Sequence, residues 1–477
     1  MTLASRLRRA AAAAALLALG CGARPPRFTN LVVIVIDTLR SDHLPMYGYE
    51  RETSPVMRRL AAEGVQLQGY AASSWTKPSV ASMFSGLVPQ RHQAISLNDR
   101  LPEEAPYLPA LLSERGFTTF AFIGNASNLG GRQGFRRGFT ESKQWIGPPK
   151  IHAAEVNRRT FALLGKARPP YFLWVHYVDP HDPYEPPSPW PAGASEQAPG
   201  TSRQGAGTYP VQPQVFAAAG TMPSAVELVA MRDQYDGEIV EVDRAIGELI
   251  DRLKASKLLD HTLVVVTSDH GEEFAEHRQL MHGQSLHEEL LRVPLILWAA
   301  EDLPRLHSDA AFWQVDFLPT VLEALGVPEP PGIDGESRWS EIGLGKAPRQ
   351  RPMSFHLDRH EGASLARLEW PLKLIERWGE PDELLFDLDR DPDEARPLPK
   401  DDPRVAGLRE RVFAWHGRGS RDALPRSGRN VDKQLKEQLA ALGYLRGGGS
   451  PRALAGRRLP LRLDPGQGLG SQAAPPD

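Results

Sequence analysis

The chain has 477 residues, of which 56 are basic and 59 acidic, so its formal net charge is −3. This balance provides no basic field, which argues against a nucleic-acid-binding protein. The length suffices for one large α/β core with a small appended domain, and the single cysteine excludes an internal disulfide.

The N-terminus has the pattern of an export signal. Three arginines within the first nine residues precede an apolar run over residues 10–20, and Cys21 follows directly. Because the run is too short to span a membrane, we predict a signal peptide over residues 1–21. Lipidation of Cys21 would then attach a bacterial cell-envelope or periplasmic lipoprotein to the membrane. The alternative is ordinary cleavage nearby, which would leave a soluble periplasmic protein.

The first predicted strand ends at an acidic residue. Residues 31–36 form a continuous apolar run rich in valine and isoleucine, which is typical of a strand buried on both faces, and Asp37 follows. A helix is predicted next, over residues 53–64.

Thr76 is predicted to lie at the start of a second helix. Pro78 fits the first turn of that helix, and Gly86 ends it. Free backbone N–H groups and the helix dipole favour an anion at such a position. An isolated Thr76 would be interpreted as a simple helix cap.

Strands are predicted over residues 118–123 and 171–176, and the second runs towards Asp179 and His181. Residues 186–220 are rich in proline, glycine, alanine and serine, so they form either a lid over the site or a flexible, disordered insert. A long amphipathic helix is predicted over residues 225–253.

A further buried strand over residues 263–266 is followed by Asp269 and His270. Ligands of open α/β sheets bind beyond the carboxyl ends of the strands, so these residues should meet Asp37 and Thr76. Such a mixed oxygen and nitrogen set suits one divalent metal ion. Mn or Zn is favoured over Ca or Mg, because calcium prefers ~6–8 oxygen ligands.

The last third of the chain is predicted to hold smaller elements. A strand over residues 293–298 precedes a helix that begins at residue 315, in which Asp316 has a structural role. Short alternating segments within residues 340–445 predict a small sheet, and residues 435–444 have the spacing of a terminal helix. Residues 446–477 are predicted to be a disordered tail.

Six segments of the chain have the character of family motifs: residues 35–43, 76–79, 176–184, 268–272, 292–295 and 383–392. In sequence and in order, they resemble the motifs of the sulfatase family of the alkaline phosphatase superfamily. The resemblance implies an α/β fold, with a mixed, mostly parallel sheet between helices in a catalytic domain over residues 30–335. It also implies a small C-terminal antiparallel sheet plus helix over residues 340–445.

The departures from this family concern the nucleophile. Family sulfatases have Cys or Ser at the position of Thr76 and oxidise it to formylglycine, an aldehyde that threonine cannot form. The arginine of their motif is replaced by Val80, and the second Asp of the usual pair by Thr38. Threonine nucleophiles resemble those of the phosphodiesterase and phosphoglycerol or phosphoethanolamine transferase branches. Lys77 either restores part of the lost positive charge or is solvated.

Motif position implies roles for two further histidines. His282 lies where many sulfatases carry a substrate-binding lysine, and either His181 or His282 could protonate the leaving oxygen. Together with Asp179, they could instead bind substrate or hold a second ion, as in two-metal relatives.

We therefore predict a metal-dependent ester hydrolase that acts through Thr76 on a small-molecule or envelope-derived phosphodiester, phosphomonoester or phosphonate. Three alternatives stay open. They are a sulfuric ester hydrolase (a sulfatase), a phosphoglycerol or phosphoethanolamine transferase, and a non-catalytic binding protein on the same scaffold.

Overall fold

The computed structural model describes most of the chain. The described residues are 28–146, 150–186, 211–300, 303–359, 362–377 and 383–428. Four predicted features lie outside them, namely the signal peptide with Cys21, most of the insert, the helix over residues 435–444 and the C-terminal tail. None of the described helices is long and apolar enough to cross a membrane.

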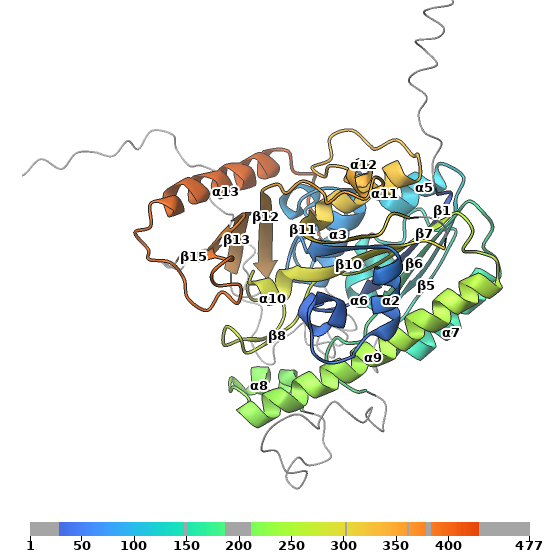
Figure 1. Ribbon diagram of the computed structural model, residues 1–477. Coiled ribbons are helices and arrows are strands. Elements are labelled where there is room, and N and C mark those ends of the chain that lie inside the picture. Colours follow the sequence, from blue (N-terminus) through green and yellow to red (C-terminus); the bar gives the residue numbers. More distant parts are fainter. Residues whose placement is uncertain are drawn as a thin grey trace, which may run out of the picture.

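An eight-stranded sheet forms the centre of the molecule (Figure 1). Its order is β11-β2-β10-β7-β1-β6-β4-β5. The strands are β1 (Asn30–Ile36), β2 (Val65–Tyr70), β4 (Thr118–Ile123), β5 (Glu141–Gln144), β6 (Tyr171–Tyr177), β7 (Thr262–Ser268), β10 (Arg292–Trp298) and β11 (Leu306–Trp313). In this sheet only β10 is antiparallel to its neighbours, β2 and β7. The carboxyl ends of the other seven strands therefore lie along one edge.

Helices cover both faces of this sheet. One face packs against α2 (Pro55–Glu63), α7 (Ala153–Leu164) and α9 (Ala225–Ala255), and the other against α3 (Thr76–Ser85), α5 (Leu108–Ser113) and α11 (Phe317–Ala324). Strand β1 contributes Val32 and Ile34 to the first core and Val33 and Val35 to the second. This double burial explains the continuous apolar run of β1 and confirms the predicted fold class.

The short elements connect these layers. The short helices are α4 (Pro89–His92), α6 (Ala126–Leu129), α8 (Pro213–Ala219), α10 (Glu288–Leu291) and α12 (Trp339–Ile342). Two small ribbons pair β3 (Asp99–Arg100) with β16 (Ser427–Gly428), and β8 (Glu273–Phe274) with β9 (Leu280–Met281).

A second, antiparallel sheet follows near the C-terminus, as predicted. Its strands are β12 (Met353–Arg359), β13 (Gly362–Glu369), β14 (Leu372–Arg377) and β15 (Leu384–Asp387). Helix α13 (Arg404–Arg421) packs on one face of this sheet, whereas Phe355 and Leu357 pack with Tyr70 and Trp75 of the catalytic domain. The small sheet thus sits directly beside the segment that leads into Thr76.

Candidate active site

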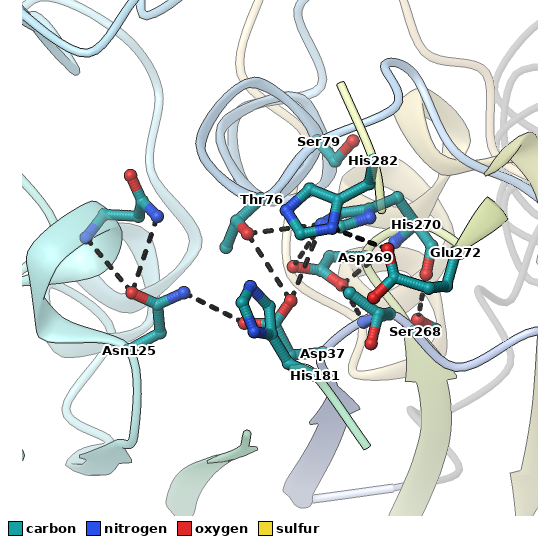
Figure 2. Close-up of polar contacts among 12 residues, drawn as sticks. Asp37, Thr76, Ser79, Asn125, His181, Ser268, Asp269, His270, Glu272 and His282 are labelled. Atoms are coloured by element: carbon teal, nitrogen blue, oxygen red, sulfur yellow. Dashed lines mark hydrogen bonds and ion pairs between the residues drawn. The ribbon is translucent and has the colours of Figure 1, made fainter. Parts of the chain in front are cut away.

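Thr76 is the first residue of α3, and Gly86 ends that helix in a left-handed conformation with φ of 66°, as predicted. The Thr76 Oγ1 atom lies 3.2 Å from His270 Nε2 and 3.5 Å from Asp37 Oδ1. Every residue of α3 is buried, so the hydroxyl is held at the amino end of a helix inside the protein. Figure 2 shows this hydroxyl pointing towards Asp37 and His270.

The other three predicted ligands come from two adjacent strands. Ile36 of β1 pairs with Ser268 of β7, so Asp37 and Asp269 follow at the same level. His270 Nε2 lies 3.5 Å from Asp37 Oδ1 and 3.6 Å from Asp269 Oδ2. These atoms form one of the groups in the described residues that could hold an ion, and all are buried.

The electrostatics of this group fit a divalent cation. Burial, together with the charge of Asp269, raises the pKa of Asp37 well above its usual value, and burial raises the pKa of Asp269 to about 7. The Oδ2 atom of Asp269 is buried and accepts no hydrogen bond. Burial also lowers the pKa of His270, which keeps its ring neutral, as a metal ligand requires. A bound cation would compensate the two buried charges.

The spacing of the ligand atoms also fits an ion. Their separations of 3.2–3.6 Å are too long for strong hydrogen bonds. They match the distance of about 3.4 Å between neighbouring ligands of a tetrahedral ion with bonds of ~2.1 Å. The residues present therefore fit the metal that this site is predicted to hold.

Several supporting contacts were not predicted from the sequence. Asn125 Nδ2 donates to Asp37 Oδ2 at 2.9 Å, and the backbone N–H groups of Thr38 and His270 donate to Asp269 Oδ1. Thr38 has a φ of 60°, a costly conformation for a β-branched residue, and its carbonyl accepts from Tyr235. The backbone of Thr38 thereby helps to position Asp269.

A single amide ties two loops of the site together. The Gln314 side chain accepts from the N–H of Ala72 at 3.1 Å, and it donates to the carbonyls of Ser268 and Asp269 at 2.8 and 3.0 Å. Gln314 follows the edge strand β11 directly. It thereby joins the segment before Thr76 to the loop that carries the metal ligands.

His181 and His282 lie beside this group, as predicted. Their ring centroids are 4.9 Å apart, and the ring of His282 lies 4.6 Å from that of His270. His282 Nδ1 is 2.9 Å from Glu272 Oε1, and Tyr184 donates to the other oxygen of Glu272 at 3.1 Å. The orientation of His282 is therefore fixed by a buried carboxylate that is itself held (Figure 2).

Asp182 is a further candidate that the sequence did not single out. It follows His181, and its Oδ1 atom lies 3.6 Å from His181 Nδ1. Both carboxylate oxygens are buried and accept no hydrogen bond. Its only signal in the sequence is its place within residues 176–184.

Asp179 lies in a different cluster. Its carboxylate is 3.3 Å from Lys150 Nζ and 3.3 Å from His152 Nδ1, and it accepts from the N–H of Ala153. Lys150 also contacts Glu238 at 2.6 Å, so a lysine ammonium already neutralises this cluster. The prediction that Asp179 holds a second ion with His181 and His282 is therefore corrected, because the Asp179 carboxylate is paired elsewhere.

Lys77 is fully buried, so the alternative of a solvated side chain is wrong. Its ammonium donates to the carbonyls of Ser96, Leu97 and Asp99 at 2.9–3.0 Å. These contacts orient the Lys77 charge towards the loop before β3.

Comparisons with known proteins identify the family of this chain. The chain is 26% identical over 326 residues to the low-salt glycan biosynthesis sulfotransferase Agl7 of Haloferax volcanii, covering 66% of this chain and 65% of that protein. It is 25% identical over 403 residues to the multifunctional alkaline phosphatase superfamily protein PehA of Trinickia caryophylli, covering 66% and 77%. The solved phosphonate monoester hydrolase of Agrobacterium radiobacter superposes with a TM-score of 0.65 at 19% identity, over 82% of this chain and 96% of that one.

The family model of the sulfatases matches residues 29–327, which is more than half of the chain and spans Asp37, Thr76 and His270. The structural likeness extends the agreement in fold into the small C-terminal sheet. The chain therefore belongs to the sulfatase family.

Proposed function

We propose that the protein is a metal-dependent hydrolase that uses Thr76 as its nucleophile on a phosphodiester, phosphomonoester or phosphonate. The observation that carries this proposal is the Thr76 hydroxyl, which lies within 3.5 Å of both Asp37 and His270 at the amino end of a buried helix. Threonine cannot be oxidised to formylglycine, so its hydroxyl is the group available for attack.

The residues of the site have distinct roles in this reaction. A divalent ion held by Asp37, Asp269, His270 and Thr76 would lower the pKa of the Thr76 hydroxyl and neutralise negative charge. The Thr76 hydroxyl loses its proton to solvent, and Thr76 Oγ1 forms a bond to phosphorus while the bond to the leaving oxygen breaks. The N–H groups at the start of α3 stabilise the transferred group. His181 or His282 donates a proton to the leaving oxygen. Water then attacks phosphorus and releases Thr76.

The nature of the nucleophile favours phosphorus over sulfur. A formylglycine hydrate expels sulfate by collapsing to an aldehyde, whereas a threonine ester must be attacked a second time at the transferred group. Phosphoryl groups permit this second attack when a metal ion neutralises their charge. Sulfate esters carry less charge, so a site built from a metal ion and a helix dipole stabilises their transfer less.

The test compares an aryl phosphodiester and an aryl phosphonate with the matching aryl sulfate. We expect the phosphorus esters to show a kcat/KM at least roughly tenfold higher, which is about 1.4 kcal/mol in the barrier. Thr76→Ala should reduce kcat by at least ~10³ at nearly unchanged melting temperature. Ser82→Ala, which removes a hydroxyl of the same helix that contacts His92, serves as the matched control. Equal or faster hydrolysis of the aryl sulfate by the wild type would overturn the proposal.

Transfer in place of hydrolysis is the second candidate, because the relative Agl7 is named a sulfotransferase. In that case an alcohol takes the group from Thr76 instead of water. Adding glycerol as an acceptor distinguishes the two reactions, since a transferase yields the glycerol ester of the transferred group, whereas a hydrolase yields its free acid. A non-catalytic binding role is less well supported, because the chain retains Asp37, Asp269 and His270 in a buried group.

A further inference from the structure

The site is rich in acidic side chains although its proposed substrate is an anion. Four buried carboxylates belong to it or lie beside it: Asp37, Asp182, Asp269 and Glu272. The position of the family's motif arginine is Val80, which packs in the apolar core. The ammonium of Lys77 is bonded to backbone carbonyls. Helix α3 therefore does not supply the arginine that this family places next to its nucleophile.

A guanidinium of the small C-terminal sheet lies beside His282. Arg359 is the last residue of β12 in the small C-terminal sheet and is 8% exposed. Its Nη1 atom donates to the carbonyl of His282 at 3.2 Å, and its Cζ atom lies 5.1 Å from the centre of the Trp75 ring. Trp75 directly precedes Thr76, and the ring of His282 lies 4.6 Å from that of His270.

The backbone is shaped to admit this guanidinium. Gly283 has a φ of 77°, and a Cβ atom there would lie 2.2 Å from Arg359 Nη1 and 2.9 Å from its Cδ. A side chain at position 283 would therefore require the arginine to shift from this position. The cation also lies over an indole ring, where its charge is attracted by the face of the π system. Gly283 and the indole ring therefore form a buried position for the Arg359 side chain.

The charge of Arg359 lies near the buried carboxyl groups of the site. Burial raises the pKa of Asp182 and of Glu272, and the positive charge of Arg359 opposes this rise. These residues belong to the loops after β6 and β7, while Arg359 belongs to a different sheet. A planar guanidinium is well suited to bind two oxygens of a phosphate-like group at once.

We propose that Arg359 is the anion-binding residue of this site and that it contacts the negatively charged oxygens of the substrate in place of the family's motif arginine. The small C-terminal sheet is then part of the active site. This inference rests on the proposed function for the identity of the anion, whereas the placement of the guanidinium is independent of it.

The experiment measures the binding of phenylphosphonate, a non-hydrolysable anion, to the full-length metal-loaded protein by calorimetry, alongside kcat/KM for the aryl ester that the wild type turns over best. Arg359→Ala should weaken phenylphosphonate binding and raise KM by roughly 10- to 100-fold. Arg359→Lys should fall between the two proteins, because lysine keeps the charge but loses the paired donors. Free guanidinium at low millimolar concentration should restore part of the activity of Arg359→Ala.

The matched control is Arg367→Ala in the neighbouring strand β13, where the guanidinium bonds to Glu369 and Ser354. Metal content and melting temperature of all variants separate loss of binding from loss of folding. If Arg359→Ala does not fold, Arg359→Lys decides in its place. The proposal would be overturned if the deciding variant bound phenylphosphonate with a dissociation constant within twofold of that of the wild type. A wild type that binds phenylphosphonate through Arg359 but prefers aryl sulfates would contradict only the proposed function.

Discussion

Asp269 illustrates how single side chains determine this site. One of its oxygens is held by the N–H groups of Thr38 and His270, and the other is buried without a hydrogen bond. The first contacts fix the orientation of the carboxylate, and the second oxygen lies 3.6 Å from His270 Nε2. A buried carboxylate in this state is stabilised by a cation.

Replacing Asp269 should therefore empty the metal site. We expect Asp269→Ala to contain at least roughly tenfold less metal than the wild type after dialysis, measured by elemental analysis, with Mn or Zn as the ion that the wild type retains. Asp251→Ala, on the exposed face of α9, is the matched control. Undiminished metal in Asp269→Ala would show that the ion is held elsewhere.

Some residues of the site could be predicted because they stand next to a recognisable sequence pattern, and others could not. Asp37, Asp269 and His270 follow apolar runs that predict buried strands. Because ligand sites in such sheets lie at the carboxyl ends of the strands, these three residues were expected to lie close together. Asn125 and Asp182 come after strands too, but nothing in their local sequence tells which way their side chains turn. Arg359 could not be found, because its contact with the site depends on how a second sheet packs on the first.

At the scale of elements, the small sheet is fastened to the core by a buried ion network. Lys373 on β14 is fully buried between Glu288 at 2.7 Å and Glu394 at 2.9 Å, and Tyr70 of β2 donates to Glu288 at 2.8 Å. The network joins strand β2, helix α10, strand β14 and the loop that follows β15. Through Arg359, the docking of this sheet is also connected to the site.

Breaking this network should destabilise the protein strongly. Lys373→Met leaves two buried carboxylates without their cation, so we expect the free energy of unfolding to fall by roughly 3–5 kcal/mol. Urea unfolding followed by tryptophan fluorescence measures the effect. Lys254→Met, an exposed lysine of α9, should change little. A Lys373→Met protein as stable as this control would mean that the network does not hold the sheet.

The same network predicts a pH dependence. Burial alone would raise the pKa of Glu394, but the charge of Lys373 and a hydrogen bond from His287 lower it to about 2. An unfolded glutamate titrates near ~4.3, so this stabilisation is complete above that pH and is lost as the pH falls towards 2. The wild type should lose melting temperature more steeply than Glu394→Gln between pH 5 and 3. Parallel curves for the two proteins would contradict this assignment.

Elements differed in how far the sequence determined them. The buried strands were predicted because they are covered on both faces, but an apolar run such as β10 does not reveal its antiparallel direction. The edge strand β11 was missed, since its partly exposed residues lack that pattern. Helix α13 was not predicted either, although Val405, Leu408 and Val412 repeat with helical spacing.

At the scale of the whole molecule, the predictions of export and membrane attachment concern residues that the structure does not describe. The charged start, the apolar run and Cys21 still predict export and lipid attachment. In a bacterial host with lipoprotein machinery, a labelled lipid precursor should tag the wild type and not Cys21→Ala. An unlabelled wild type would instead support cleavage to a soluble periplasmic form.

The hydrogen bond from the Thr38 N–H to Asp269 joins residues 231 positions apart. Strands β1 and β7, which carry these residues, are neighbours at the centre of the sheet. Forming such a pair of strands requires closing a very long loop. The chain therefore loses conformational entropy before the contacts between the strands stabilise the pair. A nascent chain therefore cannot bind the ion until β7 has been synthesised and paired. Metal loading should occur late in folding, and an excess of the ion should slow unfolding more than it accelerates refolding.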